Sequence, residues 1–292
     1  MVEYDKIFLK KSIVENKNIT SEGILAYAGL VTMSNNQLDK LFTNISMIEF
    51  ALKITNNDKD RTFKDKIKRG LINLSENDVV EIISETEDFK ANDGIIIKLN
   101  NLRIDTKNEK FILMNMKEIV TILRIKDGKL DIDKLLRYAI ILIGTINNNS
   151  KVGFTTTEDL AKKSCISDWI IKTKYNKLLE ENCIIYTHRC DKSVKCFDGT
   201  IRKVNNTYGR YSDKELVIRE AQGFYREIVG KNITGNDARG IKQKYNNLTK
   251  KIDNGYIPTE EEIQEMNYKI SLYNEKYKNS KSINELRFIA LC

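Results

Sequence analysis

Cysteine and histidine side chains, the usual protein ligands of zinc, gather in one stretch of the chain. Cys183, His188, Cys190 and Cys196 have the spacing C-x4-H-x-C-x5-C. Zinc sites in small structural modules usually contain a short C-x2-C pair, which this stretch lacks. Two interpretations stay open, a structural zinc ion or ordinary reduced cysteines, and the spacing favours the second. We therefore expect no metal and no other cofactor.

Other catalytic arrangements find little support in the residues. His188 is the one histidine of the chain, so a two-histidine metal site for phosphoryl transfer cannot be built. The stretch "GFYREIVGKN" places six residues between its glycines and ends in Asn232, so it does not match the phosphate-binding loop G-x4-G-K-[ST]. A Ser-His-Asp triad would have to use His188, which lies among basic residues. We expect a protein that is not an enzyme.

A different kind of chemistry is indicated by "SDWIIKTKYNKLLEENCIIYTHR", residues 167–189. The stretch has the pattern of a helix that runs into a strand. Its apolar side carries Ile171, Tyr175, Leu178 and Leu179. Its other side carries Trp169, Lys172, Thr173, Asn176 and Lys177. Lysine, asparagine and threonine side chains can reach phosphates and base edges in a DNA major groove. The alternative is a solvated face with Trp169 partly buried against the preceding helix.

The elements that must position this helix are predicted to occur twice. The expected helices are 21–33, 45–54 and 61–74 in the first copy, and 135–146, 155–164 and 167–182 in the second. The expected strands are 79–83 and 94–99 in the first copy, and 183–190 and 195–204 in the second. Three helices followed by a two-stranded ribbon is the order of a winged helix-turn-helix. Residues 111–133 would supply a strand and a helix between the copies.

Local signals suggest where several of these helices begin and end. Thr20 or Ser21 is suited to cap the first helix, and Thr157 is the expected N-cap of the helix over 155–164. Gly70 is expected to end the third helix of the first copy. After residue 212 the pattern is helical only, and Thr259 with Glu262 forms a predicted capping box.

Basic residues surround the candidate recognition helices. The ribbon of the second copy carries Arg189, Lys192, Lys195, Arg202 and Lys203. The third helix of the first copy carries Arg61, Lys64, Lys66, Lys68 and Arg69 beside a single acid, Asp65. Two such modules would read adjacent grooves roughly one helical turn of DNA apart. A lysine-rich helix can also be only a soluble surface, and that alternative stays open.

The totals agree with a basic, folded protein. The 292 residues carry 49 Lys and Arg against 41 Asp and Glu, a net charge of +8 that favours a polyanionic partner. The longest apolar run, residues 135–146, is too short and too polar to cross a membrane. We expect a cytoplasmic, mainly α protein with short antiparallel β-wings. Its expected parts are two winged-helix modules, 1–107 and 108–212, and a C-terminal helical region, 213–292.

Four strings in the second half resemble plasmid replication initiators of low-GC Gram-positive bacteria: "LLRYAIILIGTI", "VGFTTTEDLAKKSCIS", "KYNKLLEENCIIY" and "VNNTYGRY". The likeness covers mainly residues 110–215. It implies tandem winged-helix modules that bind repeated double-stranded DNA sequences at an origin. Trp169, Lys172, Thr173, Asn176 and Lys177 would be the recognition-helix residues, and Arg210 would touch phosphate after the wing.

The function implied in this way is initiation of plasmid or mobile-element replication by sequence-specific DNA binding. The C-terminal helices would mediate self-association or recruit host helicase or primase factors. The same modules would also suit a transcriptional regulator or an accessory DNA-binding protein of conjugation. A third alternative is a helical adaptor that binds no DNA, because a fold does not fix a function.

Overall fold

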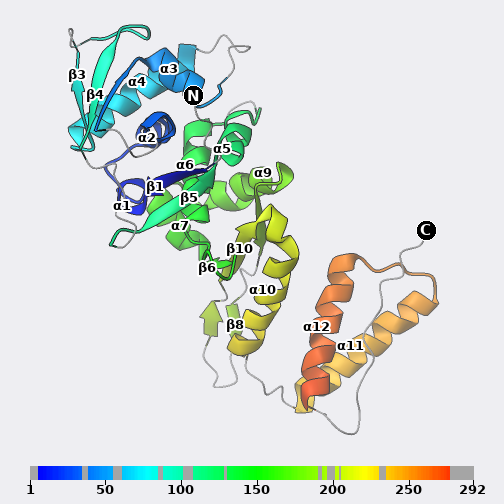
Figure 1. Ribbon diagram of the computed structural model, residues 1–292. Helices are drawn as coiled ribbons and strands as arrows, with labels where there is room; N and C mark the ends of the chain where they lie inside the picture. The colour runs from blue at the N-terminus through cyan, green and yellow to red at the C-terminus, as the bar shows by residue number, and fades with distance from the viewer. Residues whose placement is uncertain are drawn as a thin grey trace. The chain divides into compact units, whose positions relative to one another are not determined.

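The computed structural model is mainly helical with small antiparallel sheets, as the sequence predicts (Figure 1). It describes residues 6–34, 39–54, 61–84, 88–100, 108–127, 130–189, 193–195, 201–203, 205–229 and 235–276. The chain divides into two compact units, Met1–Arg189 with Asn205–Val217 and Cys190–Val204 with Ile218–Cys292. The predicted boundaries after residues 107 and 212 stay predictions.

Six elements of the first unit form what we call the first module, residues 21–99. They are, in chain order, α2 (Ser21–Ser34), β2 (Lys40–Thr43), α3 (Ile45–Ala51), α4 (Arg61–Glu76), β3 (Val80–Ile83) and β4 (Ile95–Leu99). The strands pair antiparallel in the order β2-β4-β3. The last strand in the chain therefore lies between the other two. Thr20 caps α2, because the backbone N–H of Gly23 donates to its hydroxyl oxygen at 3.0 Å.

The second module, residues 132–189 with 205–210, repeats this order. Its elements are α6 (Ile132–Ile143), β6 (Gly153–Thr155), α7 (Thr157–Ser164), α8 (Asp168–Ile170), the π-helical turn η1 (Ile171–Tyr175), α9 (Asn176–Glu181), β7 (Ile185–His188) and β10 (Asn206–Arg210). The sheet order is β6-β10-β7, again with the last strand in the middle. Two further strands, β8 (Ser193–Lys195) and β9 (Ile201–Lys203), pair antiparallel with each other.

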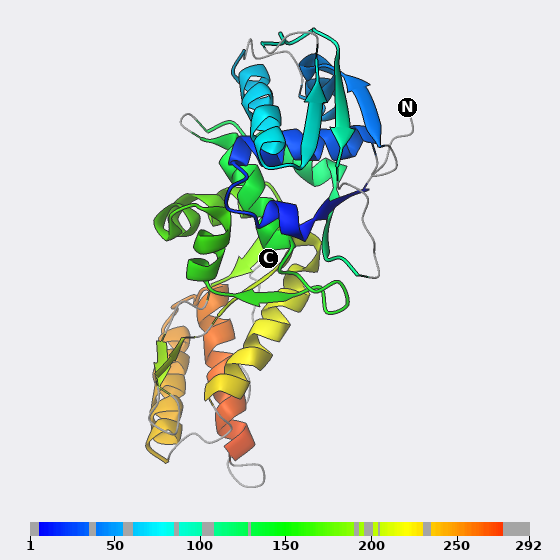
Figure 2. The ribbon, with the colours of Figure 1, turned by 90° about the vertical axis from the view of Figure 1, so that its left-hand side faces the viewer.

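Residues outside both modules hold them together within the first unit. These elements are β1 (Lys6–Lys10), α1 (Lys11–Val14), β5 (Phe111–Asn115) and α5 (Met116–Leu123). β1 pairs antiparallel with β5, and both strands bury alternate apolar side chains: Ile7 and Leu9, Ile112 and Met114. The predicted strand and helix within 111–133 are confirmed. α2 contacts both α4 and α6, so the two modules share one core (Figure 2).

The later part of the described chain is helical. Its elements are the 3-10 turn η2 (Tyr211–Asp213), α10 (Lys214–Val229), α11 (Gly235–Asp253) and α12 (Glu260–Lys276). The capping box before α12 is confirmed. The N–H of Thr259 donates to the Glu262 carboxylate at 3.0 Å, and the N–H of Glu262 donates to the Thr259 hydroxyl at 3.2 Å.

Five strands were not predicted from the sequence: β1, β2, β6, β8 and β10. Each is short, and β10 is the middle strand of its sheet although it reads N-T-Y-G-R. Asn206 and Thr207 are buried there, and the Asn206 side-chain amide donates to the Thr157 hydroxyl at 3.1 Å. Thr157 is therefore not the N-cap of α7. Thr156 has that role, because its hydroxyl oxygen accepts from the N–H of Asp159.

The expectation that Gly70 ends a helix is wrong. α4 continues through Gly70 to Glu76. A Cβ atom at Gly70 would lie 2.2 Å from the backbone oxygen of Glu22 and 2.9 Å from the Cβ of Ala26, both in α2. The glycine is there because α2 and α4 pack backbone against backbone at this point. This close approach fixes where the basic residues of α4 lie relative to the acids of α2 and α6.

Candidate nucleic-acid interface

The third helix of the second module, residues 168–181, is positioned by the turn and the N-cap that precede it. α7 ends at Cys165, whose left-handed conformation (φ 57°) turns the chain. Ser167 then caps the next helix, because its hydroxyl oxygen accepts from the N–H of Ile170 at 3.4 Å. Acidic residues at the start of α7 and lysines at its end suit the helix dipole. The candidate helix is therefore positioned by local signals on a fixed support.

One side of this helix packs into the core, as predicted. Ile171, Tyr175 and Leu179 are buried, and Leu178 is partly buried against the same core. Burial raises the pKa of Tyr175 to about 12. The opposite side is open: Trp169 is 69% exposed, Thr173 and Lys177 are exposed, and Lys172 is half-exposed. The alternative of a partly buried Trp169 is therefore wrong.

Asn176 does not lie on the open side, contrary to the prediction. Its side chain is 2% exposed and its oxygen accepts a hydrogen bond from the buried hydroxyl of Tyr138 in α6. The cause is the π-helical turn over Ile171–Tyr175, which takes more residues per turn than an α-helix and rotates the following residues. Burial raises the pKa of Tyr138 well above its usual value, so this hydroxyl stays a donor.

The open side has weak internal partners. Lys172 lies 3.4 Å from the Asp168 carboxylate, and Lys177 lies 3.6 Å from that of Glu181, both one turn away on the same helix. Exposed pairs of this kind contribute about 0–1 kcal/mol each. The Thr173 hydroxyl donates to the backbone oxygen of Trp169 at 2.7 Å, and its oxygen can still accept a hydrogen bond. Because their ion pairs are weak, Lys172 and Lys177 can exchange a carboxylate for a phosphate at little cost in free energy.

The predicted wing residues are described to different degrees. Arg189 is exposed at the end of β7. Lys195 lies in β8, and Arg202 and Lys203 lie in β9, where Arg202 is opposite Val194 and Lys203 is opposite Ser193. Lys192 lies outside the described residues. The predicted ribbon of 183–190 with 195–204 is not formed: β7 pairs with β10, and β8 and β9 pair with each other in the second unit.

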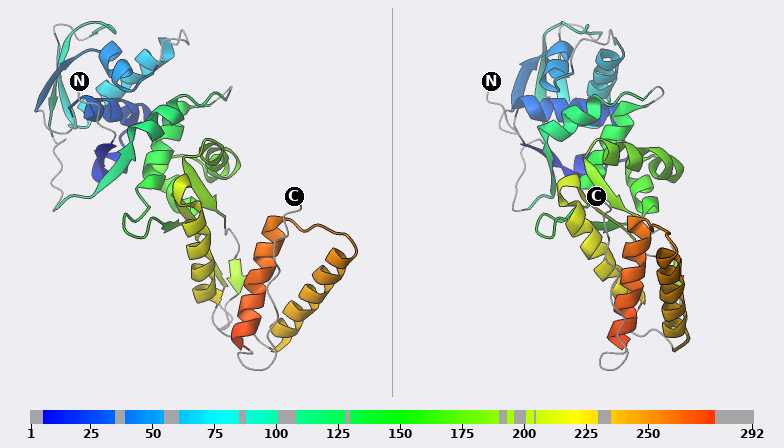
Figure 3. Two further views of the ribbon diagram at one scale, coloured as in Figure 1. Left: turned by 45° about the vertical axis from the view of Figure 1, so that its right-hand side comes forward. Right: turned by 90° about the vertical axis from the view of Figure 1, so that its right-hand side faces the viewer.

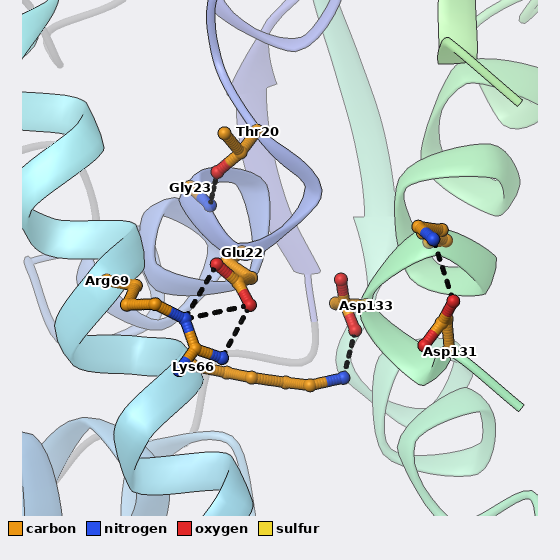
Figure 4. A network of polar contacts seen from close by, with 8 residues as sticks. Thr20, Glu22, Gly23, Lys66, Arg69, Asp131 and Asp133 are labelled. Atoms are coloured by element: carbon orange, nitrogen blue, oxygen red, sulfur yellow. Dashed lines mark hydrogen bonds and ion pairs between the residues drawn. The ribbon is translucent and has the colours of Figure 1, made fainter.

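The first module's third helix differs from the second in its electrostatics. Its described cations are each paired with a carboxylate of another element (Figure 4 shows the pairs of Lys66 and Arg69). The pairs are Lys64 with Glu49 at 3.7 Å, Lys66 with Asp133, Lys68 with Asp88, and Arg69 with Glu22 at 2.7 Å. The side chain of Arg61, at the first position of α4, lies outside the described residues.

These pairs differ from one another in burial. The guanidinium of Arg69 makes three hydrogen bonds to Glu22 of α2, but its side chain is 55% exposed. Lys66 and Asp133 are largely buried between α4 and α6. Lys68 also lies 5.2 Å from the centre of the Phe89 ring. Lys66 therefore joins α4 to α6, whereas DNA contact by the predicted cations Arg61, Lys64, Lys68 and Arg69 stays a prediction.

Arg210 is likewise a structural residue. Its Nε donates to the Glu118 carboxylate at 2.7 Å, and a terminal nitrogen donates to the backbone oxygen of Leu113 at 2.7 Å. Glu118 in turn accepts from the N–H of Asn115, with which it forms the capping box of α5. The predicted contact of Arg210 with phosphate is therefore wrong, because the guanidinium joins β10 to β5 and α5.

The zinc interpretation is only partly covered by the structure. Cys183 is exposed and carries a left-handed backbone (φ 54°), and His188 is partly buried in β7. Burial lowers the pKa of His188, which keeps its imidazole neutral. Cys190 and Cys196 lie outside the described residues. Among the residues described, no three His, Cys, Asp or Glu side chains gather as a metal site would require.

Comparisons with known proteins give little further guidance. No protein-family model matches the chain, and no curated protein matches it. Among solved structures, the crystal structure of Pi initiator protein in complex with iteron DNA matches 71% of this chain and 97% of that chain. The sequence identity is 11% and the TM-score is 0.43, a likeness too distant to carry an argument. In the described part of the chain, no helix is long and apolar enough to cross a membrane.

Proposed function

We propose that this chain is a sequence-specific double-stranded DNA-binding protein whose two modules are winged helix-turn-helix units. The repeated element order and the repeated sheet order support the winged-helix assignment. The observation that carries the function is the open side of residues 168–181. It presents an exposed indole, a hydroxyl and two weakly paired lysines on a helix that is otherwise fixed in the core.

In this proposal the helix over 168–181 enters the major groove. Lys172 and Lys177 leave their carboxylates for DNA, and Thr173 and Trp169 approach base edges and sugars. Arg189 contacts the flanking backbone. The internal pairs of α4 leave the first module with a different role, that of a support which holds α6 and the recognition helix in place. One chain then reads one major-groove segment.

We further propose, on the sequence resemblance given above, that the DNA is a set of repeated origin sites and that the protein initiates plasmid or mobile-element replication. The role is one of binding and needs no catalytic residue. Recruitment of host helicase or primase factors and self-association are assigned to the C-terminal helices in the same proposal.

Selection of bound duplexes from a pool that includes the DNA flanking the gene tests this proposal. We expect recovery of directly repeated elements from one region. We also expect the affinity for such an element to fall steeply with salt, because each neutralised phosphate changes the slope of log K against log salt by about −0.9. A single inverted repeat over a promoter would favour the regulator. No selective recovery would contradict sequence-specific binding.

A further inference from the structure

The helix α11 in the second unit has an unusual charge pattern. From Ala238 to Ile252 the sequence contains no acidic residue but five cations: Arg239, Lys242, Lys244, Lys250 and Lys251. The whole stretch lies within α11. A helix that only needs a soluble surface usually mixes both signs, because opposite charges three or four residues apart stabilise it and like charges do not.

One side of α11 packs against α12, and the cations lie elsewhere on the helix. The two helices run side by side (Figure 3). Ile241 of α11 is buried, as are Ile263, Met266, Ile270 and Tyr273 of α12. Arg239, Lys242, Lys244 and Lys250 are exposed. The packing against α12 thus explains the apolar residues on one side of α11, but it does not explain the cations on the rest of the helix.

Four exposed cations of α11 have no ion-pair partner among the described residues: Arg239, Lys242, Lys244 and Lys250. Lys251 lies 5.7 Å from the centre of the Tyr256 ring, and its charge acts on Glu262, whose pKa is lowered first by the backbone N–H of Thr259 and further by Lys251. The neighbouring helix behaves differently, since Lys269 of α12 pairs with Glu265 one turn away. The lysines of the recognition helix and of α4 also have carboxylate partners.

The helix dipole explains only part of this pattern. Lys250 and Lys251 lie in the last turn of α11, where a positive charge is favourable. Arg239, Lys242 and Lys244 lie in the first half of the helix and gain nothing from the dipole. Exposed amides lie between the cations: Gln243, Asn246 and Asn247. Amides and cations together are the side chains that donate hydrogen bonds to phosphate oxygens.

We propose that the exposed side of α11 that carries Arg239, Lys242 and Lys250, which lie within about 80° of one another around the helix, binds the phosphate backbone of double-stranded DNA without regard to sequence. The three cations span about 16 Å at 1.5 Å per residue. Duplex DNA carries on the order of ten phosphate charges over that length. The site belongs to the second unit and uses none of the residues of the recognition helix, so it is a second DNA contact beyond the proposed function.

The test uses the full chain and a duplex of unrelated sequence. The variant replaces Arg239, Lys242 and Lys250 with alanine. A control with the same loss of charge replaces three exposed lysines on other elements, Lys6, Lys40 and Lys117, with alanine. A third variant changes Lys242 and Lys250 to arginine. Alanine favours helix, so α11 should be retained, and circular dichroism checks this.

We expect the α11 variant to lose at least tenfold in affinity for the unrelated duplex at low salt. Its slope of log K against log salt should become less negative by about 2 or more, because each lost phosphate contact changes the slope by about 0.9. The arginine variant should bind like wild type, and the scattered control should lose much less. Equal losses in the α11 variant and the control would overturn the proposal, because net charge alone would then explain both.

The experiment distinguishes the failure of this proposal from the failure of the proposed sequence-specific binding. If wild-type protein prefers no selected duplex but the α11 variant still loses its affinity for unrelated DNA, the recognition proposal fails and this one stands. If wild type prefers its selected duplex and the α11 variant matches wild type on unrelated DNA, the reverse holds. Loss of binding to vesicles of anionic phospholipid with unchanged DNA binding would also overturn it and would assign the face to a lipid surface.

Discussion

Replacing Lys66 with methionine is expected to lower the free energy of unfolding by about 3 kcal/mol or more, since removal of one partner leaves a buried charge unpaired. The side chains of Lys66 and Asp133 are 17% and 6% exposed, and their pair joins α4 of the first module to α6 of the second (Figure 4). Methionine fills a similar volume, so lost packing contributes little. Urea denaturation measures the change.

A matched control exists on α6, the helix that carries Asp133. Lys134 pairs with Asp131 at 2.7 Å, but both side chains are about half exposed. The pKa of Asp131 is lowered by its hydrogen bond from Lys134, and screening by solvent keeps the value of such a pair to about 0–1 kcal/mol. Lys134→Met should therefore cost little. The double variant Lys66→Met with Asp133→Leu should recover much of the loss. Equal small effects of Lys66→Met and Lys134→Met would contradict a structural role for the α4 cations.

The second large effect is expected on DNA binding. Replacing both Trp169 and Lys172 with alanine should lower affinity for a selected duplex by about thirtyfold or more, because each lost contact is worth about 1–3 kcal/mol. Both side chains lie on the open side of the helix, so stability should change by less than about 0.5 kcal/mol each. Equilibrium binding and urea denaturation of the same variant measure the two quantities.

Two further variants serve as controls for this prediction. Asn176→Ala should do the opposite, because it leaves the buried Tyr138 hydroxyl without its acceptor, a loss of about 1–3 kcal/mol in stability. The folded Asn176 variant should bind DNA as wild type does. Lys64→Ala with Lys68→Ala should also spare specific binding, since both lysines already pair with carboxylates. If the α4 variant lost affinity and the Trp169 variant did not, the assignment of the two modules would have to be exchanged.

The helices and the recurring order could be predicted from the sequence because they rest on local signals. Ile171, Tyr175 and Leu179 are spaced four apart, and the capping box at Thr259 needs only two residues three apart. The short strands could not be predicted in this way. β10 is a central strand, yet its Asn206 and Thr207 satisfy their polar groups by contacts with distant elements, which no local pattern encodes.

The candidate site was predicted in part for similar reasons. Trp169, Lys172, Thr173 and Lys177 follow ordinary helical spacing onto the open side. Asn176 was misplaced because a π-helical turn inside the helix has no sequence signature of its own. The partners of the α4 cations were not predicted, because the acids Glu22 and Asp133 are far away in the chain and meet α4 through the packing at Gly70.

The most direct test of the central claim is photo-crosslinking of the full chain to its selected duplex with 5-bromodeoxyuridine in place of single thymines. The bromine takes the position of the thymine methyl group, which lies in the major groove. The account predicts that the crosslinked peptide contains residues 168–181 and that Trp169→Ala removes the crosslink or shifts it within that helix. Crosslinks confined to α4, or to no helix of either module, would show that residues 168–181 do not read the DNA.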